Sequence, residues 1–408
     1  MTGLDGDRVY LDWNATAPLR PEARQAMLEA MDAVGNPSSV HAEGRAAKSI
    51  VERARRQVAA LVGCEPDEVV FTSGATEAIE HALSNFHLRE IWLNNVHPAF
   101  ANGPPEIVLK RDDLPSHVIM HSGIEHDAVA RHEGYARRDL KLFKTGQIAW
   151  GPFLEFVFDD DEAHAFALQS ANSETGVLQN IERALEKTSE CKQFKAFFSD
   201  TVQSVGKRAF SFGDSKLHGA AISSHKLGGP KGSGALLSKA SNFEASLIRG
   251  GGQEQGRRSG TENVIGIAGF GAAAEAARRD LEAGVWDRVE KLRNILENTL
   301  VEAAPETIFF GKESPRLPNT SCFAVPGWKG ETQVMQMDLA GFAISAGSAC
   351  SSGKVNKASR VLLAMGFDEI TASSAIRVSL GPTTTEAEVL AFADAWKDAY
   401  RRRKARAA

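Results

Sequence analysis

The stretch Ser223-Ser224-His225-Lys226-Leu227-Gly228-Gly229-Pro230-Lys231-Gly232 directly follows the apolar run Ala220-Ala221-Ile222. Such an apolar run is typical of a buried strand, and the glycines and proline after it predict a turn where the strand ends. An amine held there, among small polar residues, can lose its proton and form an imine with an aldehyde. A surface lysine in a Gly/Pro loop would have the same local sequence, so the stretch alone leaves both interpretations open.

Short apolar runs alternate with helical patterns on both sides of this stretch. Apolar residues recur at helical spacing over 42–62, and a short strand over 68–72 leads into an alanine-rich helix that extends to about Phe86. This alternation predicts an α/β fold with a mostly parallel sheet. From about residue 283 the pattern changes to a long amphipathic helix followed by shorter elements, which indicates a second, smaller domain. The remaining predicted strands are 118–120, 166–168, 196–198, 220–222 and 235–237.

Composition excludes several classes of protein. The 408 residues include 47 Lys and Arg against 52 Asp and Glu, a net charge of −5, so we expect neither nucleic acid nor an acidic membrane as the main partner. The sequence contains no run of about 18 apolar residues, so we expect no membrane span. The N-terminus has no signal-peptide pattern. The cysteines Cys64, Cys191, Cys322 and Cys350 lack metal-ligand spacing and favour free thiols without a bound metal. We therefore expect a cytoplasmic, enzyme-sized protein.

Ser73-Gly74-Ala75-Thr76 lies where a predicted strand gives way to a helix. The first turn of a helix offers unpaired N–H groups and the positive end of the helix dipole, and Thr76 adds a hydroxyl, so a phosphate fits there. A serine-capped helix start is also a common structural device, so the segment alone does not decide between them.

Asp200 and His126 each follow a predicted strand. A carboxylate at the carboxyl edge of a sheet can pair with a pyridinium nitrogen, and Gln203, three residues later, can reach an oxygen on the same ring. An aspartate that caps the next turn is the alternative. The His126 imidazole could stack on such a ring and move protons near pH 7, or it could be an ordinary histidine at a strand end.

Cys350 and Arg377 lie in the second domain. Small residues surround Cys350, and Lys354 follows closely, which favours an accessible, reactive thiolate. Arg377 stands alone in an apolar strand pattern and therefore needs a buried anionic partner. That partner is either the α-carboxylate of a substrate, which matches the guanidinium in a bidentate manner, or a structural carboxylate.

Taken together, these segments resemble the cysteine desulfurases of the NifS/IscS type, in the class V aminotransferase branch of the fold-type I pyridoxal-phosphate enzymes. The resemblance runs through most of the chain, and the motifs occur in the same order. The matching segments are 10–16, 35–41, 73–77, 125–126, 172–176, 200–206, 223–232, 258–261 and the loop around Cys350.

The resemblance implies a large domain over 18–282, which binds pyridoxal 5'-phosphate on a mostly parallel seven-stranded sheet. It implies a smaller α/β domain formed by 1–17 and 283–408, which carries the catalytic cysteine loop. It also implies a homodimer that takes sulfur from L-cysteine as a persulfide on Cys350, leaves L-alanine, and supplies an iron–sulfur scaffold or another acceptor protein. Reaction of a thiolate with the substrate sulfur suits the electron withdrawal that this cofactor provides, and a partner thiol can remove the persulfide.

The resemblance also assigns roles to individual residues. Lys226 would bind the cofactor aldehyde, and Thr261 would reach the phosphate from the other subunit. The implied catalytic residues are Cys350, Lys226 and His126. The implied cofactor-binding residues are Ala75, Thr76, His126, Ser173, Asp200, Gln203, Ser223, His225, Lys226 and Thr261. The implied substrate-binding residues are Asn36, Asn172 and Arg377.

The chain departs from the family pattern in two places. Ser173 stands where the family usually has a second asparagine, and the region 84–165 is longer and less regular than in the family. Selenocysteine lyase, an aminotransferase of the same branch, and a catalytically silent binding homologue remain as alternatives. The Cys350 loop argues against an aminotransferase, which needs no nucleophilic thiol. The sequence identifies neither the sulfur acceptor nor the preference between sulfur and selenium.

Overall fold

The computed structural model describes residues 8–95, 118–132, 136–150, 164–189, 194–239, 246, 248–347 and 358–407. Its larger unit is built on seven strands: β2 (Val69–Thr72), β3 (Val118–Ser122), β4 (Ala136–Leu140), β5 (His164–Gln169), β6 (Phe194–Asp200), β7 (Gly219–Ser223) and β8 (Gly234–Ser238). Their order in the sheet is β2-β8-β7-β6-β5-β3-β4. Among these described strands, β8 runs antiparallel to β2 and β7, and every other neighbouring pair is parallel. The predicted mostly parallel seven-stranded sheet is therefore confirmed.

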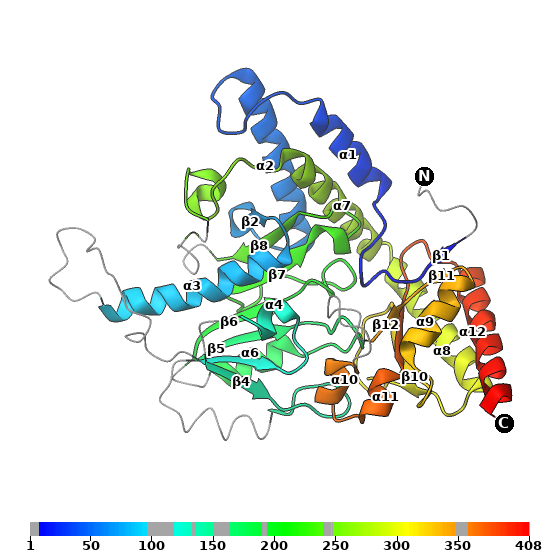
Figure 1. Cartoon of the computed structure of the whole chain (residues 1–408). Helices are drawn as coiled ribbons and strands as arrows, with labels where there is room; N and C mark the ends of the chain where they lie inside the picture. Colours follow the sequence, from blue (N-terminus) through cyan, green and yellow to red (C-terminus); the bar gives the residue numbers. More distant parts are fainter. Residues whose placement is uncertain are drawn as a thin grey trace.

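Helices cover both faces of this sheet (Figure 1). The long helices of the unit are α1 (Pro21–Met31), α2 (Ala42–Val62), α3 (Ala75–Asn95) and α7 (Val264–Glu282). The short ones are η1 (Pro66–Glu68), α4 (Asp127–Ala130), α6 (Ile181–Ser189), η4 (Ser224–Lys226) and η5 (Gln253–Gly256). The helix predicted over 42–62 is confirmed as α2, whereas α3 is longer than expected and ends at Asn95 instead of near Phe86.

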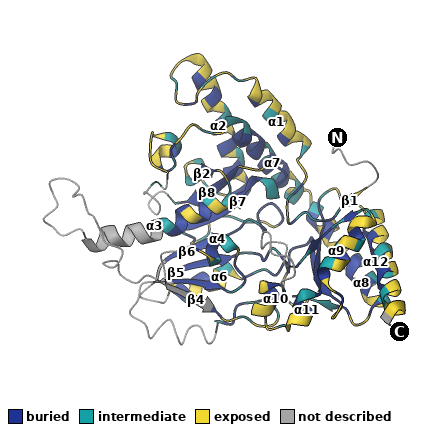
Figure 2. Ribbon diagram, viewed as in Figure 1, coloured by how far each residue is buried: buried dark blue, intermediate teal, exposed yellow. Residues whose placement is uncertain are grey.

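Successive strand residues face opposite sides of the sheet, as the period of two requires. Phe197 packs in a core with α2 and α7, and its neighbour Phe198 packs in a second core with α3. Both rings are fully buried, and Figure 2 shows the strands as the buried layer between the helices. Because both faces are covered, most of the strands are apolar runs, which is why the sequence pattern located them. The edge strand β4, with the sequence Ala-Arg-Arg-Asp-Leu, was not predicted.

The second unit has its own core. Its elements are β1 (Val9–Tyr10), α8 (Val285–Ala303), β9 (Ile308–Phe309), β10 (Thr320–Ala324), α9 (Gly330–Leu339), β11 (Phe342–Ala343), β12 (Ser345–Ala346), α10 (Arg360–Ala364), α11 (Glu369–Ser373), β13 (Ala375–Ser379) and α12 (Glu386–Ala407). An antiparallel sheet of order β12-β13-β10-β9 packs with α8, α9 and α12, with Trp396 and Phe323 at its centre. The N-terminal β1 pairs with β11, and Leu11 is buried in this core.

These separate cores support the division of 18–282 from 1–17 with 283–408, and the boundaries themselves stay a prediction. Within the described residues, no helix combines the length and the apolar character that crossing a membrane requires.

A buried ion pair fixes the segment between β8 and α7. Glu254 and Gln255 have φ angles of +48° and +58°, in the left-handed region that residues other than glycine rarely adopt. The Glu254 carboxylate accepts hydrogen bonds of 2.8 Å from both terminal nitrogens of Arg55 on α2, and one of 2.8 Å from the N–H of Phe71 on β2. These contacts hold the strained backbone against the sheet.

We predict that Arg55→Met destabilises the protein by about 3–5 kcal/mol, because it leaves the Glu254 carboxylate buried without its counter-charge. Urea unfolding of the two proteins measures the difference. Arg56→Met, which changes the exposed neighbour on the same helix, is the control and should stay within about 0.5 kcal/mol of the wild type. Equal unfolding curves for Arg55→Met and the wild type would contradict the prediction.

Candidate active site

A cavity of about 590 Å³ lies where several strands of the large sheet end. Parallel strands bring their carboxyl ends to one edge, and that edge is where α/β folds bind ligands. Residues predicted from separate segments meet here: Ala75, Thr76, His126, Ser173, Asp200, Gln203, Ser223, His225, Lys226 and Arg377 all line the cavity.

One end of the cavity suits a phosphate. The first turn of α3 faces it with Ala75 and Thr76, and Ser223 and His225 lie close by at the end of β7. The buried hydroxyl oxygen of Ser233 also lines this space and has no hydrogen-bond partner among the described residues. Unpaired helix N–H groups, hydroxyls and a buried oxygen without a partner together match the acceptors of a phosphate group.

His225 is neutral at pH 7 in this structure. Burial, together with the positive charges of Lys226 and Lys231, lowers the pKa of His225 to about 4. Its Nδ1 lies 3.1 Å from the hydroxyl of Thr16. A neutral imidazole can still donate one hydrogen bond, so His225 can bind a phosphate oxygen while Lys231, which also lines the cavity, supplies charge.

Asp200 ends β6 and is only 8% exposed. Burial raises the pKa of its carboxyl, and three features oppose that rise: the charge of His126, the N–H of Val202, and the charge of Lys226. The Val202 N–H donates to Oδ1 at 3.0 Å. A buried carboxylate that lacks a full counter-charge is well suited to pair with a protonated aromatic nitrogen.

His126 caps the short helix α4 and accepts a hydrogen bond from the Ala128 N–H at 3.1 Å through Nδ1. Its ring lines the cavity and is exposed. That position is compatible with stacking on a planar ligand, as the sequence predicts. Behind it, the buried carboxyl of Glu125 has its pKa raised by burial to about 8, and it accepts hydrogen bonds from the Ser122 hydroxyl and from the Gln169 N–H.

Lys226 lies in η4, immediately after β7, and its amine is held by the N-terminal segment. Nζ donates to the main-chain oxygens of Asn14 and Ala15. The turn after it needs glycine, because Gly228 has φ +84° and a Cβ there would lie 2.6 Å from the Arg20 side chain. The close approach of 18–20 thus explains one glycine of the stretch around Lys226.

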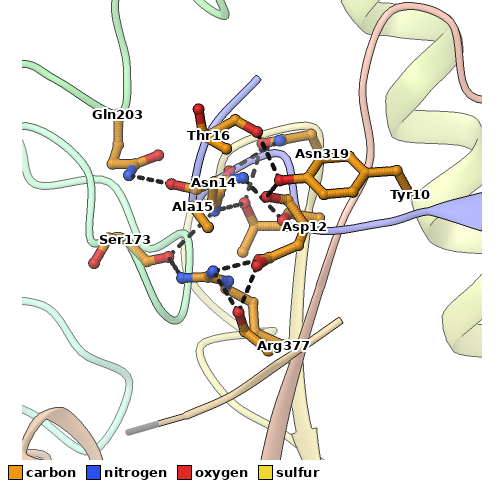
Figure 3. A network of polar contacts seen from close by, with 12 residues as sticks. Tyr10, Asp12, Asn14, Ala15, Thr16, Ser173, Gln203, Asn319 and Arg377 are labelled. Atoms are coloured by element: carbon orange, nitrogen blue, oxygen red, sulfur yellow. Dashed lines mark hydrogen bonds and ion pairs between the residues drawn. The ribbon is translucent and has the colours of Figure 1, made fainter. Parts of the chain in front are cut away.

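Arg377 lies on β13 and is 3% exposed, yet it also lines the cavity. It forms an ion pair of 2.6 Å with Asp12 and donates to the Ser345 hydroxyl and to the main-chain oxygen of Ser173 (Figure 3). The structural carboxylate that the sequence left as an alternative is therefore present. A role in binding a substrate carboxylate stays a proposal.

The sequence pattern assigns no role to Asn14, although the matching segment 10–16 contains it. Asn14 is 1% exposed, and its main-chain oxygen accepts hydrogen bonds from the amide of Gln203 and the amine of Lys226. Its side-chain oxygen accepts from Lys207 and Asn319, each at 3.0 Å. Figure 3 shows Asn14 at the centre of this network. A run of polar residues next to a strand was the only signal that could have indicated it.

Other predicted residues do not line the cavity of this chain. Asn172 is buried, and its side-chain oxygen accepts from the N–H groups of Glu174 and Thr175, so it shapes the turn that presents Ser173. Asn36 and Thr261 are absent from the cavity lining. The role expected for Thr261 concerns a second subunit, which a single chain does not test. Cys350 lies outside the described residues.

A family model, curated proteins and solved structures each match nearly the whole chain. The aminotransferase class-V family model matches residues 9–392. A cysteine desulfurase of Cereibacter sphaeroides is 37% identical over 94% of this chain and 93% of its own, and one of Klebsiella pneumoniae is 35% identical over 94% and 90%. The X-ray structure of a NifS-like protein from Rickettsia africae, 29% identical, superposes with a TM-score of 0.82 over 97% of this chain and 100% of that one. Because the family model and these relatives each span nearly the whole chain, the protein belongs to the class-V aminotransferase family.

Proposed function

We propose that this chain is a pyridoxal 5'-phosphate-dependent cysteine desulfurase, which converts L-cysteine to L-alanine and transfers the sulfur through an enzyme persulfide. The observation that carries the proposal is the single cavity around which Lys226, Asp200, the first turn of α3 and Arg377 meet. Each of these groups suits a different part of the cofactor or the substrate. The family membership and the cysteine desulfurases among the relatives support the same activity.

The residues of the cavity fit the cofactor. Lys226 would bind its aldehyde, Asp200 its ring nitrogen, and Gln203 its ring oxygen. The phosphate would lie against the first turn of α3 with Ser223 and His225. Once bound, the cofactor withdraws electrons from the bonds of the attached amino acid. His126 would lie against the ring and hold or move a proton there.

Arg377 would bind the substrate carboxylate with its guanidinium. Its ion pair with Asp12 fixes the orientation of the side chain, and its hydrogen bond to Ser173 ties it to the edge of the cavity. The resemblance also implies that Asn36 and Asn172 bind the substrate, and these two contacts remain part of the proposal.

The sulfur transfer would use the thiolate of Cys350. The carbon–sulfur bond of cysteine breaks, and its carbon keeps the electron pair and takes a proton to become the methyl group of alanine. The sulfur forms a bond to Cys350 Sγ as a persulfide. All atoms are accounted for without an outside oxidant or reductant.

We further infer a homodimer in which Thr261 of each protomer completes the phosphate site of the other. The persulfide sulfur would pass to an iron–sulfur scaffold or to another acceptor protein in the cytoplasm. The slight negative charge of −5 gives no reason to invoke nucleic acid as a partner.

The deciding experiment incubates the purified protein with pyridoxal phosphate, dithiothreitol and either L-cysteine or L-selenocysteine. We expect alanine and sulfide in equal amounts from cysteine. Turnover of selenocysteine alone would identify a selenocysteine lyase, and no turnover of either substrate by cofactor-loaded protein would identify a catalytically silent homologue.

We predict that Lys226→Ala loses the visible absorption band of the bound cofactor and loses activity by several orders of magnitude, because no other amine occupies its position. Absorption spectra and alanine formation measure the two effects. Lys216→Ala, which changes an exposed lysine, should keep both. A retained band in Lys226→Ala would remove this lysine from its proposed role.

We predict that Cys350→Ala keeps the visible band and its change on adding cysteine, but loses sulfide release by several orders of magnitude, because no thiolate remains to take the sulfur. Cys64→Ala, which removes a partly buried free thiol, is the control and should behave as the wild type. Normal sulfide release by the Cys350 variant would refute its assignment as the nucleophile.

A further inference from the structure

Lys207 is a buried lysine without a carboxylate partner among the described residues. It is 5% exposed, and its Nζ donates to the side-chain oxygens of Asn14 and Gln203 at 3.0 and 3.1 Å. Burial lowers its pKa well below the ordinary value, and the positive charges of Lys226 and Arg377 lower it further. Burying an amine near two cations costs stability, so its presence calls for an explanation other than stability.

The backbone conformation of the preceding residue, Gly206, brings Lys207 into this buried position. Gly206 has φ +77°, and a Cβ at this position would lie 2.4 Å from the side chain of Leu227, the residue after Lys226. A left-handed glycine therefore turns the chain in close contact with the Lys226 segment. The N–H of Lys207 also donates to the Ser204 oxygen at 3.0 Å, which closes the turn after Gln203.

The contacts of Gln203 fix which way its amide points. The main-chain oxygen of Asn14 can only accept, so the Gln203 atom that faces it at 3.1 Å is the amide nitrogen. The amide oxygen then faces Lys207 Nζ. Held at both ends, the amide keeps its NH₂ group at the wall of the cavity, which Gln203 lines.

We propose that Lys207 is a positioning residue for the cofactor: through Gln203 it aims an N–H donor at the ring oxygen of the pyridoxal ring. The proposal rests on the proposed function, since it presupposes this cofactor. The anionic phosphate and ring oxygen of the cofactor would favour the charged form of Lys207, and a charged amine strengthens its hydrogen bond to the Gln203 oxygen and so holds the Gln203 NH₂ group more firmly.

The consequence is a lower proton affinity at the nitrogen that joins Lys226 to the cofactor. A donor held toward the ring oxygen would disfavour a proton on this nitrogen, because the ring oxygen and the nitrogen would share that proton. Other titratable or charged side chains line the same cavity as Lys226: His126, Asp200, His225, Lys231 and Arg377. The variants below leave all of them unchanged, so a shift reports the Lys207–Gln203 pair.

The test titrates the visible absorption band of the cofactor-loaded protein against pH. We expect Lys207→Met to bind the cofactor but to raise the midpoint by roughly one pH unit, the size of effect expected when a hydrogen bond to the deprotonated form is lost. Gln203→Leu should shift the midpoint in the same direction. The double variant should shift it no further than the larger single shift, because both act through one donor.

Lys239→Met is the matched control. Lys239 also donates to a main-chain oxygen, that of Ser215 at 2.7 Å, but it does not line the cavity. This variant should keep the wild-type midpoint. A role of Lys207 in stability alone would lower the melting temperature of Lys207→Met and leave its midpoint unchanged, which would overturn the proposal.

Gln203→Leu answers the question even where Lys207→Met does not fold, since an unchanged midpoint in that variant shows that the donor is irrelevant and overturns the proposal. Additive shifts in the double variant would overturn it as well. Failure of the proposed function has different signatures. A wild-type protein without a visible band does not bind the cofactor, and one that has the band but forms no alanine from cysteine is not a desulfurase, although its band can still be titrated.

Discussion

The cavity depends on one buried polar residue, Asn14. Its main-chain and side-chain groups bond to Gln203, Lys207 and Lys226 in the large unit, and to Asn319 and Thr320 in the second unit. Buried polar groups must stay paired, so a shift of either unit would break several of these bonds together. The cavity wall is thus set by contacts between the units as well as by the sheet.

Burial shifts the pKa values of titratable groups in the cavity and next to residues that line it. Burial raises the pKa values of Asp200, of Glu125 to about 8 and of Glu174 to about 7, and it lowers the pKa of Lys207. Each shift means that the fold disfavours the charged form of the group. Of these four groups only Asp200 lines the cavity, so a ligand with a protonated ring nitrogen would supply a counter-charge to that carboxylate, and its binding would then stabilise the fold.

The sequence pattern predicts what is local and periodic. Apolar runs located six strands of the large sheet but not β4, whose sequence Ala136–Leu140 is mostly charged. Residues that follow those runs, such as Thr76, Asp200 and Lys226, meet because parallel strands share a carboxyl edge. The roles of Asn14 and Asp12 could not be predicted in this way. Asn14 and Lys207 are 193 positions apart, and Asp12 and Arg377 are 365 apart, so no local period relates them.

Arg377 shows how a structural ion pair and a binding role are compatible. A guanidinium has five donor hydrogens, and a lone buried one would be strongly destabilising, so Asp12 balances its charge before any substrate arrives. The main-chain oxygen of Ser173 accepts hydrogen bonds from Arg377 and Asn14 at 3.0 and 3.2 Å. Because these contacts involve only the main chain of Ser173, the support of Arg377 does not depend on which side chain stands at this position. The side chain of Ser173 lines the cavity and affects its shape, whereas its main-chain oxygen fixes the position of Arg377.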